Sequence, residues 1–285
     1  MPKLTDVGYI RQVLGRHGFH FSKSLGQNFL INPTVCPRMA EACGVSKDGG
    51  ALEIGPGFGV LTHELALRAG KVVALELDPR LPAVLAETLA EHDNVEIVPG
   101  DVLKTDLAAL LRDRFGSMPV AVCANLPYYI TSPVIMYLLE SRLPVTSITV
   151  MVQKEAAQRL CATPGTRECG AVTLAVQYYA EAKRLFDVPR GSFMPAPNVD
   201  SCVIRLTPHG KNALEGDAEK RLFSLIRAAF GQRRKTLGNA LQSAGFTRAQ
   251  ITAALDAVGI PATARAEQLT LSQFEALATC PKLDE

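Results

Sequence analysis

Short apolar runs alternate with amphipathic stretches along the first half of the chain. Runs rich in aliphatic and β-branched residues are typical of buried strands, whereas apolar residues spaced three or four apart predict helices. The alternation predicts strands over 51–54, 72–77, 95–98, 120–124 and 147–152, and helices over 60–68, 79–89, 107–114 and 133–139. Strands and helices that alternate in this way form a doubly wound parallel sheet, so the predicted fold class is α/β, with a Rossmann-like sheet.

The pattern changes on either side of this alternation. Residues 5–16 and 33–43 predict two short helices before the first strand, and 199–206 predict a late strand that could form an antiparallel edge of a mixed sheet. Residues 207–217 are polar and rich in glycine, which is typical of a linker. We therefore predict a larger domain over 1–207 and a small all-helical domain over 208–285.

The predicted helical domain carries two sequence signals for helix starts. The spacing from Thr247 to Gln250 and from Ser272 to Glu275 fits a capping box, in which two side chains satisfy the first backbone N–H groups of a helix. Apolar residues continue at helical spacing to the end of the chain. No strand is expected in this region.

A glycine-rich loop follows the first predicted strand. Gly55, Gly57 and Gly59 allow a ligand to approach the backbone closely, and Glu76 ends the second strand, at the position typical of a carboxylate that binds ribose hydroxyls. The pattern fits a nicotinamide-dependent enzyme, a methyltransferase with a nucleoside cofactor, or a plain tight turn. The third glycine comes early for dinucleotide binding, and S-adenosylmethionine has no pyrophosphate, so a methyltransferase is favoured.

The tetrapeptide Asn125-Leu126-Pro127-Tyr128 follows the fourth predicted strand. An exocyclic amino group on a base is a poor nucleophile because its lone pair is delocalised into the ring. The Asn125 side-chain oxygen and a backbone carbonyl can accept its two N–H bonds, proline stiffens the turn, and the Tyr128 ring can stack on the base. Alone, Asn125 could be a turn residue and Tyr128 a half-buried aromatic. Their position at a strand end beside the glycine loop favours base methylation.

For two further residues, a functional role and a purely structural role are equally plausible. Asp101 follows the third strand, where its carboxylate could accept a hydrogen bond from an adenine amino group or cap a helix. Phe193 lies in a proline-rich turn, where it could stack on the opposite face of a flipped base or pack against the core.

Net charge is only +2 and the pI is about 8.1, so nucleic-acid binding must be argued from local patches. A basic cluster opens the helical tail. Together with basic residues elsewhere it could contact RNA phosphates, or it could be an ordinary solvated face. The residues in question are Lys23, Arg221, Arg227, Arg233, Arg234 and Lys235.

Several other classes of protein lack support. Seven scattered cysteines without a C-x-x-C pair predict free thiols in a reducing cytoplasm, and the five dispersed histidines show no metal-binding spacing, so no metal is expected. The N-terminus has no apolar signal-peptide core. Residues 115–139 are uncharged, but Pro119, Pro127 and Pro133 argue against a membrane span. No G-x-S-x-G or H-E-x-x-H motif supports a hydrolase.

Taken together, motifs over nearly the whole chain resemble the ribosomal RNA adenine N6-dimethyltransferases. The motifs occur in order as Ser24-Leu25-Gly26-Gln27-Asn28-Phe29-Leu30, Glu53-Ile54-Gly55-Pro56-Gly57, Glu76-Leu77-Asp78, Asn125-Leu126-Pro127-Tyr128, Phe193-Met194-Pro195-Ala196-Pro197-Asn198-Val199-Asp200-Ser201 and Arg233-Arg234-Lys235-Thr236. The Asn-Leu-Pro-Tyr form and the basic tail resemble the small-subunit (16S) branch associated with kasugamycin sensitivity. Resistance methyltransferases of large-subunit RNA usually carry Ile in place of Leu126.

The resemblance implies that the larger domain binds S-adenosylmethionine and methylates N6 of two adjacent adenosines near the 3′ end of small-subunit (16S) ribosomal RNA. The small helical domain would bind RNA. By the family pattern, the cofactor is bound by Asn28, Leu30, Gly55, Gly57, Glu76, Asp101 and Asn125. Asn125, Tyr128 and Phe193 would hold the target base.

The expected partner is small-subunit ribosomal RNA or an immature small subunit in the cytoplasm, where the reaction would be a step in ribosome biogenesis. A monomer is expected, without a metal and without a membrane. Alternatives are a large-subunit RNA methyltransferase of the antibiotic-resistance type, a nicotinamide-dependent oxidoreductase, and a non-catalytic assembly factor that reuses this fold.

Overall fold

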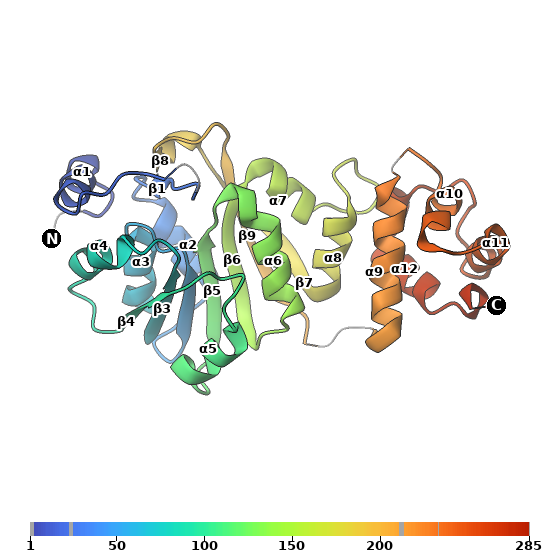
Figure 1. Ribbon diagram of the computed structural model, residues 1–285, viewed down its shortest axis with the longest axis horizontal. Coiled ribbons are helices and arrows are strands. Elements are labelled where there is room, and N and C mark those ends of the chain that lie inside the picture. Colours follow the sequence, from blue (N-terminus) through green and yellow to red (C-terminus); the bar gives the residue numbers. More distant parts are fainter. Residues whose placement is uncertain (1–2, 23–24, 211–213, 233, 285) are drawn as a thin grey trace. The chain divides into compact units, whose positions relative to one another are not determined.

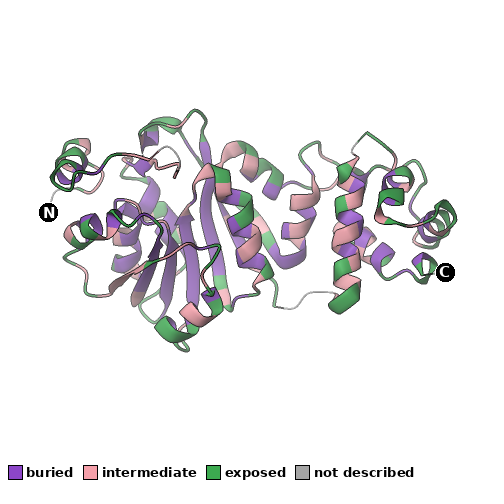
Figure 2. Cartoon of the chain, in the orientation of Figure 1, coloured by how far each residue is buried: buried purple, intermediate pink, exposed green. Residues whose placement is uncertain are grey.

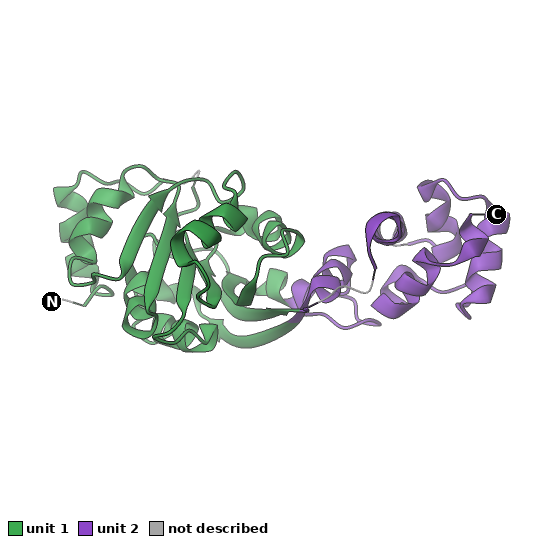
Figure 3. Cartoon of the chain, turned by 90° about the horizontal axis from the view of Figure 1, so that it is seen from below, with its two compact units in different colours: residues 1–157, 182–208 green, residues 158–181, 209–285 purple. Residues whose placement is uncertain are grey.

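The computed structural model of the protein describes residues 3–22, 25–210, 214–232 and 234–284. The chain forms two compact units (Figure 3). Unit 1 comprises 1–157 and 182–208, and unit 2 comprises 158–181 and 209–285. The predicted boundary at 207/208 lies next to the end of unit 1. The prediction placed residues 158–181 in the larger domain, whereas they belong to unit 2. Part of the predicted linker, 211–213, lies outside the described residues.

A seven-stranded mixed sheet forms the centre of unit 1 (Figure 1). The strands lie in the order β4-β3-β2-β5-β6-β9-β7. Strands β2 to β6 are parallel, whereas β9 pairs antiparallel with β6. The strands are β2 (Gly50–Ile54), β3 (Lys71–Glu76), β4 (Val95–Pro99), β5 (Val120–Asn125), β6 (Val145–Gln153), β7 (Ala180–Val188) and β9 (Ser201–Pro208). The predicted doubly wound parallel core is confirmed.

The late strand differs from its prediction in one respect. Strand β9 is antiparallel, as predicted, but it lies inside the sheet because β7 forms the edge. Strand β7 was not predicted. Its sequence carries Glu181, Lys183, Arg184 and Asp187, and exposed charges of this kind protect sheet edges from pairing with other chains. The same charges hide the alternation that identifies a strand.

Helices cover both faces of this sheet. Ala51 and Ala121 pack in one buried cluster with residues of α2, α3 and α4, whereas Leu52 and Val122, the next residues along each strand, are equally buried outside that cluster. Figure 2 shows the central strands β2, β3, β5, β6 and β9 buried along most of their length, whereas the edge strands β4 and β7 are mostly intermediate or exposed. The helices with most or all of their residues in unit 1 are α1 (Val7–Arg16), α2 (Val35–Cys43), α3 (Val60–Arg68), α4 (Leu81–Thr88), α5 (Leu107–Phe115), α6 (Thr131–Glu140) and α7 (Lys154–Leu160).

Unit 2 is helical. Its core contains Leu222, Leu225, Ile226 and Ala229, which are buried on one face of α9. Its helices are α8 (Ala171–Tyr179), α9 (Gly216–Gly231), α10 (Leu237–Leu241), α11 (Arg248–Ala257) and α12 (Leu271–Ala278). Among the described residues, no helix is long and apolar enough to cross a membrane.

One of the two predicted capping boxes is confirmed. The Thr247 hydroxyl accepts from the Gln250 N–H at 3.2 Å, and Gln250 accepts in return from the Thr247 N–H at 2.8 Å. The prediction for Ser272 was wrong, because Ser272 lies inside α12. Thr270 and Gln273 form that box instead. The spacing from Thr270 to Gln273 and that from Ser272 to Glu275 both fit the motif. Thr270 has the extended backbone that a helix-capping residue adopts, so the helix starts there.

Candidate active site

A cavity opens at the carboxyl ends of β2, β3, β4 and β5 in unit 1. Strand β2 pairs with β3 on one side and with β5 on the other, so the chain reverses its direction of winding at this point. Ligands of open α/β sheets bind at such a switch point. The register places Ile54 beside Leu75 and Ala124, which brings the ends of the three strands together. All nine predicted catalytic and cofactor-binding residues line this cavity.

The glycine loop forms one wall. Gly55 and Gly57 have φ values of 71° and 59°, a left-handed conformation that favours glycine. A Cβ atom on Gly55 would meet no heavy atom within 4 Å, whereas one on Gly57 would lie 3.2 Å from the Phe29 ring. The backbone of Gly55 is therefore open to a ligand. At Gly57 the loop packs against residues 25–30, which line the cavity and are called the N-terminal segment below.

Glu76 ends β3 beside this loop and is 7% exposed. One of its carboxylate oxygens, Oε1, accepts a hydrogen bond from the Asp78 N–H at 2.7 Å. Burial raises the pKa of Glu76, opposed by hydrogen bonds from backbone N–H groups, those of Asp78 and Gly57 among them. These bonds hold the carboxyl group in one orientation at the cavity wall.

Asp101 lies in the turn after β4. Its Oδ1 accepts from the Leu103 N–H at 3.0 Å, and its Oδ2 is 3.6 Å from Nζ of Lys104. The alternative role as a helix cap is wrong, because Asp106 caps α5 by accepting from the Ala109 N–H at 2.9 Å. Asp101 instead lines the cavity.

Asn125 is the last residue of β5. Its Nδ2 donates to the Asn28 carbonyl at 3.3 Å, a bond that orients the side-chain amide. Among the described residues, none donates to Oδ1 of Asn125. The amide oxygen therefore remains available as an acceptor, while the Nδ2 group bonds to the backbone of Asn28.

Tyr128 follows in a short 3-10 turn, Tyr128–Ile130. Its hydroxyl is 2.7 Å from Oγ of Ser201. Burial raises the pKa of this phenol, so the group stays protonated at neutral pH. Phe193 lines the same cavity from β8 (Phe193–Met194), which pairs with β1 (Phe29–Leu30), and it is only 3% exposed. A base could reach only the part of the Phe193 ring that faces the cavity.

The N-terminal segment covers the cavity and is tied to the sheet through Asp78. Nε2 of Gln27 donates to Oδ2 of Asp78 at 2.7 Å, and Nε of Arg80 donates to Oδ1 at 2.8 Å. Nη1 of Arg80 also donates to the His20 carbonyl at 3.1 Å. The side chain of Asp78 is 2% exposed. Asn28 and Leu30 reach the cavity on the segment that this network holds.

We expect Asp78→Asn to lower the free energy of unfolding by about 2 kcal/mol at pH 7. The Arg80 guanidinium lowers the pKa of Asp78 from 3.8 to about 2. A lowered pKa means that the stabilisation is complete above pH ~4 and is lost as the pH falls toward 2. Urea unfolding of wild type and Asp78→Asn from pH 7 downward measures the difference in their free energies of unfolding. This difference should disappear below pH ~4. Equal free energies of unfolding at pH 7, or a difference that stays constant at low pH, would contradict the stabilising role of the Asp78–Arg80 ion pair.

Glu53 is a cavity residue to which the sequence interpretation assigned no role. It is 1% exposed, and its Oε2 has no hydrogen-bond partner among the described residues. Burial raises its pKa to about 8, so the carboxyl group is protonated at pH 7. The sequence feature that could have identified Glu53 as a site residue is its position two residues before Gly55, in the motif Glu-x-Gly-x-Gly.

The predicted RNA-binding residues do not form one patch on α9. Arg221 and Arg227 are separated by about 1.7 helical turns, which places them on different faces. Nη2 of Arg221 is 2.6 Å from Oδ1 of Asp284, whereas Arg227 is exposed. Arg234 and Lys235 are exposed between α9 and α10. Lys23 and Arg233 lie outside the described residues. RNA binding by these residues stays a prediction.

The chain matches the family model described as ribosomal RNA adenine dimethylase over residues 18–280. It is 50% identical over 280 residues to ribosomal RNA small subunit methyltransferase A of Geobacillus thermodenitrificans (strain NG80-2), covering 96% of each chain. It is 45% identical over 282 residues to the protein of that name from Lachnoclostridium phytofermentans, covering 98% of this chain and 97% of the relative.

Two solved structures are also similar. The dimethyladenosine transferase of Plasmodium falciparum matches with a TM-score of 0.75 and 27% identity, over 87% of this chain and 95% of that one. The 23S rRNA methyltransferase ErmE matches with a TM-score of 0.70 and 30% identity, over 90% of this chain and 100% of that one. Motifs, fold and full-length identity agree, and this chain therefore belongs to the ribosomal RNA adenine dimethylase family.

Proposed function

We propose that this protein transfers methyl groups from S-adenosylmethionine to N6 of two adjacent adenosines in the 3′-terminal hairpin loop of small-subunit (16S) ribosomal RNA, giving N6,N6-dimethyladenosine. The observation that carries this proposal is the position of Asn125 at the switch-point cavity, where its Nδ2 donates to the Asn28 carbonyl and no described residue donates to its Oδ1. The relatives named small subunit methyltransferase A support the choice of RNA.

The cavity residues fit S-adenosylmethionine. The space beside Gly55 admits a ligand against the backbone, and the unpartnered Oε2 of buried Glu53 is a polar atom that a polar ligand would satisfy. Glu76 would accept from the ribose hydroxyls and Asp101 from the adenine amino group. Asn28 and Leu30 would cover the cofactor. The cofactor supplies a methyl group on a sulfonium that is already an activated leaving group.

The protein residues then orient the base. Oδ1 of Asn125 and the Leu126 carbonyl accept the two N–H bonds of the target amino group, so that its lone pair points toward the methyl donor. Tyr128 and Phe193 stack on the two faces of the base, each stack worth roughly 1–3 kcal/mol in single-strand binding. The transfer is a direct displacement without a covalent intermediate on the enzyme.

Unit 2 binds the RNA in this proposal, through the exposed basic residues that precede α10. Its substrate is small-subunit ribosomal RNA or the immature subunit in the cytoplasm. The enzyme works as a monomer and needs no metal for methyl transfer, since the sulfonium is already activated. In this proposal unit 1 carries catalysis, and unit 2, which includes residues 158–181, carries RNA binding.

The direct test is transfer of labelled methyl groups to small ribosomal subunits from cells that lack this modification, followed by nuclease digestion. We expect N6,N6-dimethyladenosine at two adjacent positions near the 3′ end. Transfer to large-subunit RNA only would place the protein with the 23S methyltransferases, which ErmE represents among similar structures. No transfer to either RNA would favour an assembly factor, and binding of NAD in place of S-adenosylmethionine would favour an oxidoreductase.

We expect Glu76→Gln to weaken S-adenosylmethionine binding about tenfold or more, because a hydrogen bond to a charged acceptor contributes roughly 1.5–3 kcal/mol. Calorimetric titration with the cofactor measures this effect. Glu41→Gln, an exposed change on α2, is the control and should leave affinity unchanged. Equal affinity in wild type and Glu76→Gln would remove Glu76 from the cofactor site.

A further inference from the structure

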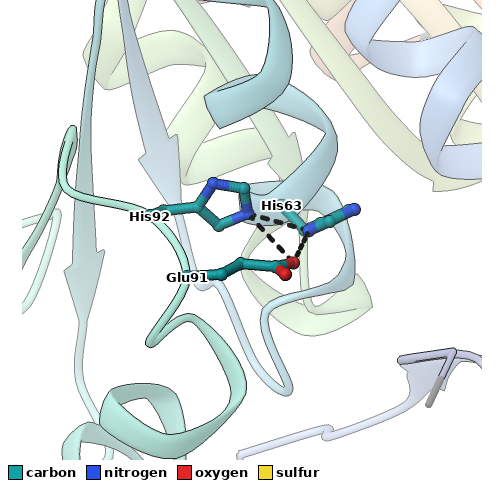
Figure 4. Close-up of side chains that lie close together, drawn as sticks. All are labelled: His63, Glu91 and His92. Atoms are coloured by element: carbon teal, nitrogen blue, oxygen red, sulfur yellow. Dashed lines mark hydrogen bonds and ion pairs between the residues drawn. The ribbon is translucent and has the colours of Figure 1, made fainter. Parts of the chain in front are cut away.

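Two histidines and a glutamate converge outside the cavity (Figure 4). His63 lies on α3, and Glu91 and His92 lie on the loop between α4 and β4. Nδ1 of His63 is 2.8 Å from Nε2 of His92 and 3.2 Å from Oε1 of Glu91. The third distance, from Nε2 of His92 to Oε1 of Glu91, is 3.7 Å. Three potential metal-ligand atoms thus form a compact triangle.

This triangle has the size of one face of a metal coordination sphere. A tetrahedral zinc ion with ligand bonds of about 2.0–2.1 Å holds its ligand atoms roughly 3.3 Å apart. The three measured distances, 2.8, 3.2 and 3.7 Å, lie on both sides of that value. A single proton forms a good hydrogen bond between only two of these atoms, whereas a cation accepts a lone pair from all three.

We propose that His63, Glu91 and His92 bind a divalent transition-metal cation, with zinc as the expected ion. Imidazole nitrogen suits zinc and its neighbours in the first transition series, whereas magnesium and calcium favour all-oxygen ligand sets. The side chains of His92, His63 and Glu91 are 9%, 28% and 40% exposed. The site is therefore open on one side, where water completes the coordination.

The backbone around these ligands is held in place. Nδ2 of Asn94 donates to the carbonyls of Ala66 and Ala69 at 3.0 and 3.1 Å, which fixes the loop after His92 to the C-terminal end of α3. The His92 N–H donates to the Leu89 carbonyl at 2.9 Å. Ligands on a supported backbone lose little freedom when a metal binds, so the apo arrangement already favours binding.

A metal at this site would link α3, whose Val60 and Leu61 line the cavity, to the loop between α4 and β4. Helix α3 follows the glycine loop directly, and the His63 N–H donates to the Gly59 carbonyl at 2.9 Å. The ion would tie α3 to the loop that precedes β4. A ligand that binds the folded chain alone also raises its apparent stability. We therefore expect metal binding to stabilise unit 1, with no part in methyl transfer.

The experiment uses the untagged full-length protein after treatment with a chelator, because a histidine tag would bind the same ions. Cobalt(II) is titrated while visible absorption is recorded, since its absorption strength reports tetrahedral coordination, and zinc is then added as competitor. We expect one equivalent of cobalt with an intense spectrum that zinc removes. His92→Gln, His63→Gln and Glu91→Gln should each weaken binding at least tenfold.

His20→Gln is the matched control, because His20 is exposed on unit 1 and lies outside this cluster. Zinc should raise the melting temperature of wild type and of His20→Gln, but not that of the cluster variants. Glu91→Gln changes an exposed side chain and tests the site if a histidine variant fails to fold. A wild type that gives no tetrahedral cobalt spectrum would overturn the proposal. So would binding that survives in all three cluster variants, which would point to the cysteines.

Discussion

Asn125→Ala should lower the rate of methyl transfer by roughly a hundredfold or more while leaving RNA affinity within about twofold. The change removes the side-chain oxygen of a cavity residue at the end of β5, an acceptor that no described residue uses. Without this acceptor, the lone pair of the target amino group stays delocalised into the ring, and its alignment with the methyl donor is lost. Single-turnover transfer to unmethylated small subunits measures the rate, and filter binding measures RNA affinity.

Two controls separate chemistry from structure. Asn239→Ala changes an exposed asparagine on α10 and should keep full activity. Because Nδ2 of Asn125 also bonds to the Asn28 carbonyl, the variant's affinity for S-adenosylmethionine must be measured as well. A loss of transfer that is matched by an equal loss of RNA binding would refute the proposed role of Asn125.

Arg234→Glu combined with Lys235→Glu should weaken RNA binding by roughly ten- to a hundredfold at 0.1 M salt, without a change in cofactor affinity. Both side chains are exposed before α10, and neither lines the cavity. Each lost phosphate contact removes one released counterion. The slope of log affinity against log salt should therefore fall by about 1.4–1.8 for the pair.

Arg11→Glu combined with Arg112→Glu is the matched control, because it makes the same change in net charge at exposed positions on α1 and α5. This control should leave both the affinity and the salt slope nearly unchanged. RNA binding by Arg234→Glu/Lys235→Glu at wild-type strength would remove the basic cluster from the interface. Equal losses in both double variants would show that total charge matters and the local patch does not.

Local patterns in the sequence predicted most elements of unit 1. Helix α3 spans 60–68 as predicted, and the predicted strand over 120–124 matches β5 to within one residue. These segments bury one face or both, so their apolar periodicity is strong. The charged edge strand β7 and the two-residue strands β1 and β8 carry no such periodicity and were missed. The helical tail was predicted, but the placement of 158–181 in unit 2 was not.

In the candidate site, too, local patterns predicted some features and missed others. Asn125, Glu76 and Gly55 were identified because each ends or follows a strand that the sequence predicts, and parallel strands bring their carboxyl ends to one edge. Their hydrogen-bond partners come from distant segments. The Asn28 carbonyl bonds to Asn125 and the Gln27 side chain reaches Asp78 only because the N-terminal segment passes the carboxyl ends of β3 and β5.

By itself, the sequence determined the α/β fold class, the succession of its main strands and helices along the chain, and the family of this protein, because strand and helix periodicity and short motifs are local properties of the chain. Only the tertiary structure decided which side chains meet. His63 and His92 are 29 positions apart, yet their ring nitrogens lie 2.8 Å from each other because α3 packs beside the loop before β4. The burial that protonates Glu53 also arises only when helices close over the strand. Contacts between distant segments depend on packing geometry, which residue spacing does not encode.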